Sequence, residues 1–226
     1  IGGAMTYLEL CVRVREESGV SGTGPASTIN QVGVLAKIVG WVRDADLDIQ
    51  RFKTDWKFLW RRTQSALVIG QQSYTAIDLS LSDLKDLSRF WVNDQPMRIV
   101  DWDEWVDRYE PQGTSGPNNS GLPQVVTIAP DGSFMFYPVP DSAYSTRADY
   151  FKMPVALNGD SDVSAIPTAY HDCIVQKALI YYGKFEEDQN LIQLASLEYE
   201  QKLTELCRDY LPKMGFAPSP YARGLY

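Results

Sequence analysis

Apolar and polar residues alternate with helical spacing at both ends of the chain, and short strand-like runs lie between them. Near the start, Thr6 and Glu9 have the spacing of a capping box, and Gly19 offers a terminator. These signals predict a helix over residues 7–18. The glycine-rich stretch 19–28 that follows has no period and is predicted to be an exposed loop.

A longer helix is predicted over residues 31–53, where apolar residues recur at steps of three, four and seven. A second apolar stripe, which includes Val34 and Ile38, covers another face of its first half. A helix that is apolar on two sides needs two neighbours. Another subunit is a candidate for one of them.

Residues 55–158 differ in character, because short runs rich in β-branched and aromatic residues are separated by turn residues. The predicted strands are 56–60, 66–69, 90–92, 97–100, 125–128, 134–137 and 148–152. The clearest hairpin is 125–137, where Pro130, Asp131 and Gly132 supply the backbone angles of a tight reversal. This part of the chain is therefore predicted to be a β module.

One segment inside the β module, 101–109, carries aromatic residues at i, i+3 and i+7, which predicts a short amphipathic helix. These residues are Trp102, Trp105 and Tyr109. Asp101 and Glu104 are placed to cap this helix. The stretch 111–123, rich in Gly, Asn, Ser and Pro, is predicted to be a flexible loop.

Helical periodicity returns after the β module. A proline, which is favoured in a first turn, begins a predicted helix over residues 167–185. A last long helix is predicted over 189–210, with Glu198 and Lys202 ordered as a favourable i, i+4 pair. The proline- and glycine-containing segment 212–226 cannot bury itself alone, so we expect it to be disordered or ordered by a partner.

The predicted fold class is α+β: a bundle of about four helices, two N-terminal and two C-terminal, with an inserted antiparallel β module and an extended C-terminal tail. The expected parts are an N-terminal helical hairpin over 5–54, a β-rich insertion over 55–158, a C-terminal helical hairpin over 165–211 that packs with the first, and a tail over 212–226.

The composition narrows the classes of protein. The 226 residues are 44% apolar, enough for a core, and the formal net charge is -8. An acidic chain is not expected to grip nucleic acid, although it can surround DNA without adhering to it. No apolar run approaches the ~18 residues of a membrane span, and the start shows no secretory signal. A soluble chain is therefore expected.

Side chains that could carry chemistry are few. The single histidine, His171, lies two residues from Cys173, so the two side chains diverge by about 200° around a helix. Asp44, Asp46 and Asp48 resemble a metal cluster, but alternate residues of a helix point to opposite sides. We therefore expect His171 to be a partly buried residue with one hydrogen bond. No catalytic, cofactor or metal site is predicted, and no enzymatic activity.

The remaining candidates are interface residues. Aromatic residues and arginine are the usual anchors of protein interfaces. Asp46 interrupts the apolar stripe of its helix, either at the rim of the buried face or as the partner of an ion pair with a neighbouring subunit. The candidate interface residues are Trp41, Asp46, Trp91, Trp105, Arg108, Tyr109, Tyr221, Arg223 and Tyr226. Core burial is the alternative for Trp41.

The three cysteines, an odd and widely spaced set, are predicted to be buried reduced thiols.

Short motifs in a fixed order run from Met5 to about Leu211. They are Met5-Thr6-Tyr7-Leu8-Glu9-Leu10, Gly19-Val20-Ser21-Gly22-Thr23-Gly24-Pro25, Asp48-Ile49-Gln50, Asp55-Trp56-Lys57-Phe58-Leu59, Asp101-Trp102-Asp103, Arg108-Tyr109, Ile128-Ala129-Pro130-Asp131-Gly132, Pro138-Val139-Pro140-Asp141 and Ile166-Pro167. In this order the chain resembles the phage adaptor proteins, the head-to-tail connector subunits beneath the portal in podovirus-like and some other tailed phages.

The resemblance implies a structural subunit of a dodecameric ring that docks on the portal protein, with nozzle or tail-tube proteins attached below. DNA would pass through the lumen during ejection without specific binding. The implied location is the virion head–tail junction, after synthesis in the host cytoplasm. The C-terminal segment is expected to lie against the portal or a neighbouring subunit.

Two other functions remain open from the residues alone. One is a cell-wall hydrolase that uses paired carboxylates among Asp101–Asp107. The other is a carbohydrate- or receptor-binding virion module that uses the aromatic residues of 91–105.

Overall fold

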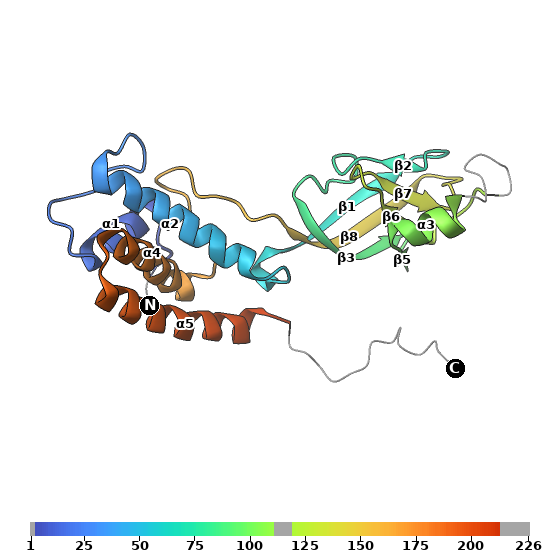
Figure 1. Ribbon diagram of the computed structural model, residues 1–226. Helices are drawn as coiled ribbons and strands as arrows, with labels where there is room; N and C mark the ends of the chain where they lie inside the picture. Colours follow the sequence, from blue (N-terminus) through green and yellow to red (C-terminus); the bar gives the residue numbers. More distant parts are fainter. Residues whose placement is uncertain (1–2, 111–118, 213–226) are drawn as a thin grey trace, which may run out of the picture. The chain divides into compact units, whose positions relative to one another are not determined.

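The computed structural model describes residues 3–110 and 119–212, and these form an α+β fold, as predicted. They divide into two compact units (Figure 1). The helical unit comprises residues 3–58 and 154–212, and the β unit comprises Leu59–Met153. The β unit is therefore an insertion between the N-terminal and C-terminal helices of the helical unit.

The first two helices of the helical unit follow from their sequence signals. Helix α1, Tyr7–Glu17, begins at the predicted capping box, in which the N–H of Glu9 donates to Thr6 Oγ1 and the N–H of Thr6 donates to the Glu9 carboxylate. Helix α2 spans Gly33–Phe52 and packs on both α1 and α4, His171–Glu186. The two neighbours that its two apolar stripes require thus lie in the same chain.

Of the bounds predicted for the C-terminal helices, only the start of α4 is wrong by more than one residue. A 3-10 turn over Thr168–Tyr170 precedes α4, which begins four residues later than expected. Helix α5, Gln189–Tyr210, has the predicted bounds, and the Asp188 carboxylate caps it by accepting from the N–H of Asn190. Lys202 of α5 forms its ion pair with Glu205 rather than with Glu198.

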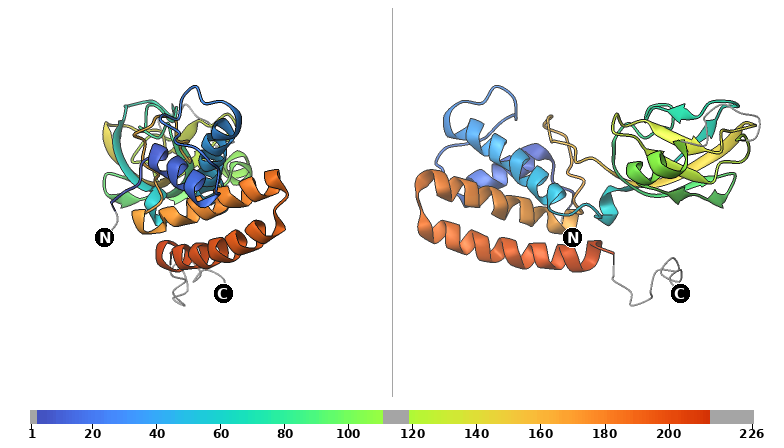
Figure 2. Two further views of the ribbon diagram at one scale, coloured as in Figure 1. Left: turned by 90° about the vertical axis from the view of Figure 1, so that its left-hand side faces the viewer. Right: turned by 45° about the vertical axis from the view of Figure 1, so that its right-hand side comes forward.

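Helix α5 is the outer layer of the helical unit. It runs back along α4 and packs mainly on that helix (Figure 2). Only Ala195 and Leu206 of its residues are fully buried. The face of α5 turned away from α4 is therefore open to a partner.

Gly183 of α4 marks a close approach of α4 to α5. A Cβ at this position would lie 2.9 Å from Cγ1 of Ile192 and 3.4 Å from its backbone N. We expect Gly183→Ala to lower the free energy of unfolding by about 1–3 kcal/mol through overpacking. Chemical denaturation followed by circular dichroism measures this.

The matched control is Gly40→Ala in α2. A Cβ at Gly40 meets no atom within 4 Å, and alanine is favoured over glycine in a helix by about 1 kcal/mol. Gly40→Ala should therefore raise the stability. Equal stability of the two variants would contradict the close packing of α4 on α5.

The β unit contains two four-stranded sheets, with the strand orders β1-β8-β3-β4 and β2-β7-β6-β5. The strands are β1 Trp60–Leu67, β2 Ser73–Tyr74, β3 Leu84–Val92, β4 Gln95–Pro96, β5 Arg98–Ile99, β6 Val125–Ile128, β7 Phe134–Tyr137 and β8 Tyr144–Lys152. The pairings are antiparallel except for that of β5 with β6.

The main core of the β unit lies between the two sheets. Phe90 of β3 and Phe136 of β7 meet there with ring centroids 5.4 Å apart, and Tyr150 of β8 joins the same cluster. The hairpin of β6 and β7 has the predicted bounds, and Gly132 takes the positive φ of +83° that its turn needs. The apolar side chains of each sheet are thus buried by the other sheet.

Two expectations about the β unit are wrong. The run predicted as a strand over 56–60 is a 3-10 turn at Lys57–Leu59, and only its last residue begins β1. The Asp101 side chain makes no capping hydrogen bond, although α3, Trp102–Arg108, forms where it was predicted. Glu104 instead accepts hydrogen bonds from Arg98 and Arg108, which holds the helix to β5.

Helix α3 covers the outer face of the β2-β7-β6-β5 sheet. Its Trp105 is 1% exposed and packs with Val125 of β6 and with Tyr137 of β7. Most of the predicted loop 111–123 lies outside the described residues, and so does the predicted tail beyond residue 212. Within the described ranges, none of the helices has the length and hydropathy needed to cross a membrane.

Candidate interaction surfaces

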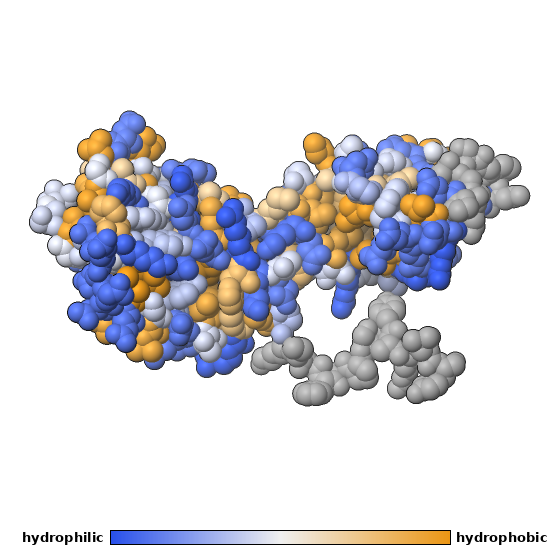
Figure 3. Space-filling view, viewed as in Figure 1, coloured by the Kyte–Doolittle hydropathy of each residue, from blue (hydrophilic) through white to orange (hydrophobic). Residues whose placement is uncertain are grey.

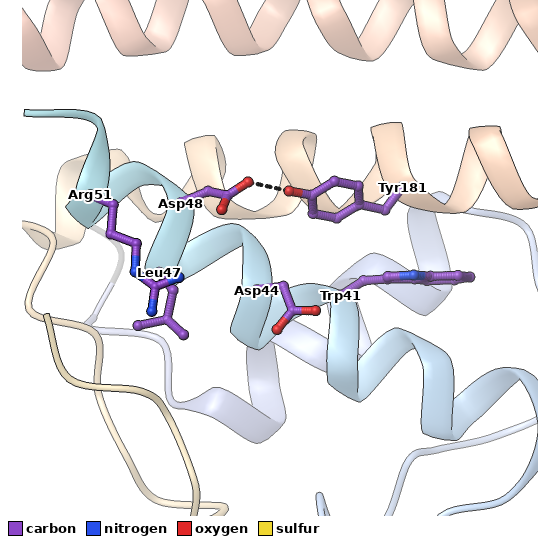
Figure 4. Close-up of a pocket in the computed structure, with 6 residues that line it drawn as sticks. All are labelled: Trp41, Asp44, Leu47, Asp48, Arg51 and Tyr181. Atoms are coloured by element: carbon purple, nitrogen blue, oxygen red, sulfur yellow. Dashed lines mark hydrogen bonds between the residues drawn. The ribbon is translucent and has the colours of Figure 1, made fainter.

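A groove of about 430 Å³ lies on the helical unit, along α2 and beside α4 (Figure 4). The residues that line it are Trp41, Asp44, Leu47, Asp48, Arg51 and Tyr181. The groove therefore combines carboxylates with aromatic rings, the combination that suits a basic side chain.

The two carboxylates of this groove lie one turn apart on α2. Asp48 accepts a hydrogen bond from the Tyr181 hydroxyl and lies 3.8 Å from the ammonium of Lys177. Burial raises the pKa of Tyr181, and the bond to Asp48 raises it further. Asp44 lies 3.7 Å from the Arg43 guanidinium. Both carboxylates of the groove thus already lie in partly exposed ion pairs, which stabilise the fold little.

Asp46 lies on the opposite side of α2 and is fully buried. Its carboxylate accepts hydrogen bonds from the Ser164 hydroxyl and from Gln50 Nε2, the latter at 2.7 Å. Burial raises the pKa of Asp46 to about 6, although both hydrogen bonds act to lower it. Neither the expected rim position of Asp46 nor its expected ion pair with a neighbouring subunit is found, because the buried carboxylate joins α2 to the segment that leads into α4.

His171 is also fully buried and makes two hydrogen bonds, one more than expected. Its Nδ1 accepts from the N–H of Met5 at 3.2 Å, and its Nε2 lies 3.1 Å from the carbonyl oxygen of Ile166, to which it donates. Burial lowers the pKa of His171. The neutral imidazole thus links the backbone at Met5, before α1, to the backbone at Ile166, before α4.

The cysteines and acidic residues form no reactive cluster in the part of the chain described. Cys11 and Cys173 are buried free thiols, and burial raises the pKa of each to about 12. Cys207 is a free thiol that is only partly buried. Residues 3–110 and 119–212 contain no group of three or more His, Cys, Asp or Glu side chains that could hold a metal ion.

Trp41 belongs to an aromatic cluster at the end of the groove. It is half-buried, with its ring centroid 5.6 Å from that of Phe185 and 6.1 Å from that of Tyr182. Phe185 is 44% exposed, and the ammonium of Lys37 lies 3.4 Å from its ring centroid. Trp41 therefore contributes both to packing and to the surface.

The candidates near α3 separate into core and surface. Trp105 is core, and Tyr109 is half-buried with its ring centroid 5.2 Å from that of Tyr137. Arg108 is exposed and pairs with Glu104. The tail candidates Tyr221, Arg223 and Tyr226 lie outside the described residues.

The open face of α5 was not predicted from the sequence. Leu194 is 64% exposed and Leu197 is 58% exposed, and both lie off the stripe that packs on α4. Figure 3 shows apolar surface on both units, interspersed with hydrophilic residues. The signal was present in the sequence, because these two leucines stand at i, i+3 outside the main apolar stripe.

The outer face of the β1-β8-β3 sheet was also missed, except for Trp91. The Arg147 guanidinium lies 4.6 Å from the centroid of the Trp91 ring, and Arg62 lies 5.4 Å from that of Trp60. Arg62 also makes two hydrogen bonds to Asp149, at 2.6 and 2.8 Å. This face is therefore an ordered array of arginine and tryptophan.

Comparison with known proteins adds one family. Residues 5–219 match the family model described as SU10 adaptor protein, which is nearly the whole chain. No curated protein sequence matches the chain.

Proposed function

Because the chain belongs to the SU10 adaptor protein family, we propose that it is a structural subunit of the head–tail junction of a tailed bacteriophage. Copies of it form a ring, a dodecamer, that docks on the portal protein and carries tail proteins below. DNA passes through the lumen of this ring during ejection. The match over residues 5–219 is the observation that carries the proposal.

The surface of the helical unit supports an assembly role. Leu194 and Leu197 expose most of their side chains on the open face of α5, and Phe185 is exposed at the aromatic cluster of Trp41. Exposed apolar side chains that gather on one face favour contact with another protein. The net charge of -8 also suits a ring around DNA, because like charges keep the duplex from adhering to the wall.

The proposed role needs no catalysis. In the acidic segment that a hydrolase would use, Asp101, Asp103 and Asp107 are exposed and Glu104 is held by two arginines, an arrangement that does not favour a catalytic cleft. A sugar-binding role for Trp105 is disfavoured by its burial. These contacts favour a structural function over the two alternatives.

Virus particles assembled without the chain test the proposed function. We expect DNA-filled heads that carry portal but no tail, seen by electron microscopy, and restoration of tails when the chain is supplied. Tailed, infectious particles made in its absence would refute the proposal.

We expect Leu197→Glu on α5 to reduce assembly without loss of fold. A carboxylate at a position 58% exposed changes the free energy of unfolding by about 0.5 kcal/mol or less. Buried in a contact, the same charge should lower the affinity for portal at least tenfold. Co-sedimentation with purified portal rings measures this.

Ile77→Glu is the control, since Ile77 is 77% exposed and belongs to the β unit rather than to α5. It should bind portal like the unaltered chain. Equal binding by both variants and the unaltered chain would exclude α5 from the contact.

A further inference from the structure

The outer face of the β1-β8-β3 sheet carries side chains from three strands that are far apart in the sequence. Arg62 of β1 and Arg89 of β3 both stand opposite Asp149 of β8 in the sheet register. Two pairs further along, Trp91 of β3 stands opposite Arg147 of β8. Neighbouring positions of β8, such as Tyr150, point into the core, so these side chains share the other face.

This face is rigid and its charge is positive. Arg62 is fixed by two hydrogen bonds to Asp149, whose side chain is only 9% exposed. Arg147 stacks on Trp91 and pairs with Asp94, a residue whose side chain is 85% exposed. Arg89 is exposed and forms no ion pair with the described residues. Ordered tryptophan and arginine side chains are the commonest anchors of protein interfaces.

The outer faces of the two sheets of the β unit differ in how far they are covered. Helix α3 covers the outer face of the β2-β7-β6-β5 sheet, where Trp105 packs against Val125. On the β1-β8-β3 sheet, Trp60 remains 38% exposed and Arg62 has 48% of its side chain exposed. Helix α3 and the tryptophan–arginine face therefore lie on opposite sides of the β unit.

The outward side of α3 has the opposite charge. Asp101, Asp103, Asp107 and Glu110 are exposed there and form no ion pairs with other described residues. Val106, 37% exposed, lies among them. The one exposed arginine of the helix, Arg108, is paired with Glu104. An acidic surface with a small apolar centre is the complement of the tryptophan–arginine face.

We infer that the tryptophan–arginine face of one copy binds the outward side of α3 of a second copy, so that β units associate head to tail. The complementary charges set the orientation and exclude pairing of like faces. Since the two surfaces lie on opposite sides of one unit, the contact is heterologous and leads to a ring rather than to a closed dimer. This inference rests on the proposed function as a ring subunit and assigns its contact.

Charge exchange tests the contact. The full-length chain is measured by native mass spectrometry and sedimentation, alone over a range of concentrations and during titration onto portal rings of the same virus. Arg89→Glu and Asp107→Lys each place like charges in the contact and should weaken association between copies at least tenfold. Combined in one chain, they restore opposite charges and should recover most of that loss.

Lys184→Glu on α4 is the matched control, because it makes the same change in net charge at an exposed position of the helical unit. It should associate like the unaltered chain. Raising the ionic strength should weaken association of the unaltered chain more than that of a variant with one charge reversed.

The outcomes separate the contact from the proposed function. If the unaltered chain fills portal rings cooperatively and Arg89→Glu does so equally well, the contact is wrong and the function stands. If the chain does not bind portal but self-associates, and the single charge reversals weaken this association while the double reversal restores it, the contact stands and the function fails. A chain that neither self-associates nor binds portal overturns both.

Discussion

Asp46→Asn is expected to remove a pH dependence of stability worth about 3 kcal/mol between pH 4 and pH 7. Burial raises the folded-state pKa of Asp46 from 3.8 to about 6. The stability that the protonated carboxyl confers is therefore complete below pH 3.8, and it is lost as the pH rises through 6. The pKa difference corresponds to about 3 kcal/mol. Asparagine cannot ionise, so this loss should be absent.

Denaturant titrations of both proteins at several pH values measure the effect. The stability of the asparagine variant minus that of the unaltered chain should increase as the pH rises. His171 acts in the opposite direction, because its lowered pKa makes the fold lose stability as the pH falls below 6.5. Since both proteins contain His171, its contribution cancels in the difference.

Asp44→Asn is the control for this measurement. It removes the same charge from α2, one turn before Asp48, but at an exposed position. A substitution of similar size at an exposed position is expected to change the stability by about 0.5 kcal/mol or less. A similar slope for Asp44→Asn and Asp46→Asn would show that net charge, rather than the buried contact with Ser164, sets the dependence.

Trp105→Ala should lower the stability of the β unit by about 3–5 kcal/mol, since it empties the packed space between α3 and β6. Trp91→Ala should lower it by about 1 kcal/mol or less, because Trp91 lies on a half-exposed sheet face. Hydrogen exchange followed by mass spectrometry reads both effects in peptides of the β6–β7 hairpin. Peptides of α4 should be unaffected, because the helical unit has its own packing.

The effects of the two substitutions on association between copies should be in the reverse order. Trp91→Ala should weaken association between copies, whereas folded Trp105→Ala should associate in proportion to its folded fraction. If Trp91→Ala destabilised the β unit as much as Trp105→Ala, Trp91 would be a core residue and not an anchor.

The helices were the part of the fold that the sequence predicted best. Helix α5 has the predicted bounds because its 22 residues carry one continuous apolar stripe, with the capping residue Asp188 before them and Pro212 after them. The start of α4 was wrong by one turn, since Pro167 precedes a 3-10 turn that no periodicity reveals. Local signals are sufficient where hydrogen bonds close within four residues.

Strands were harder, because their partners are distant. Most residues of β1 are exposed, including Arg62 and Gln64, so its apolar content is low. Its pairing with β8, about eighty residues further along the chain, decides that it is a strand. The β6–β7 hairpin was predicted because its turn lies between its two strands.

The candidate sites show the same limit. Asp46 was expected at a surface because its hydrogen-bond partner Ser164 lies 118 residues away. Trp105 was expected at an interface, although Val125 and Tyr137 cover it. The tryptophan–arginine face assembles from three separate strands, and only Trp91 was picked out in advance. Side-chain type identified candidates, but burial depended on contacts across the fold.

Native mass spectrometry of the purified chain mixed with portal rings of the same virus tests the central claim most directly. We expect a complex in which the portal mass increases by an integral number of 25.5 kDa chains, filled cooperatively to a single closed ring. Portal rings that keep their original mass at every concentration of the chain would contradict its role as an adaptor subunit.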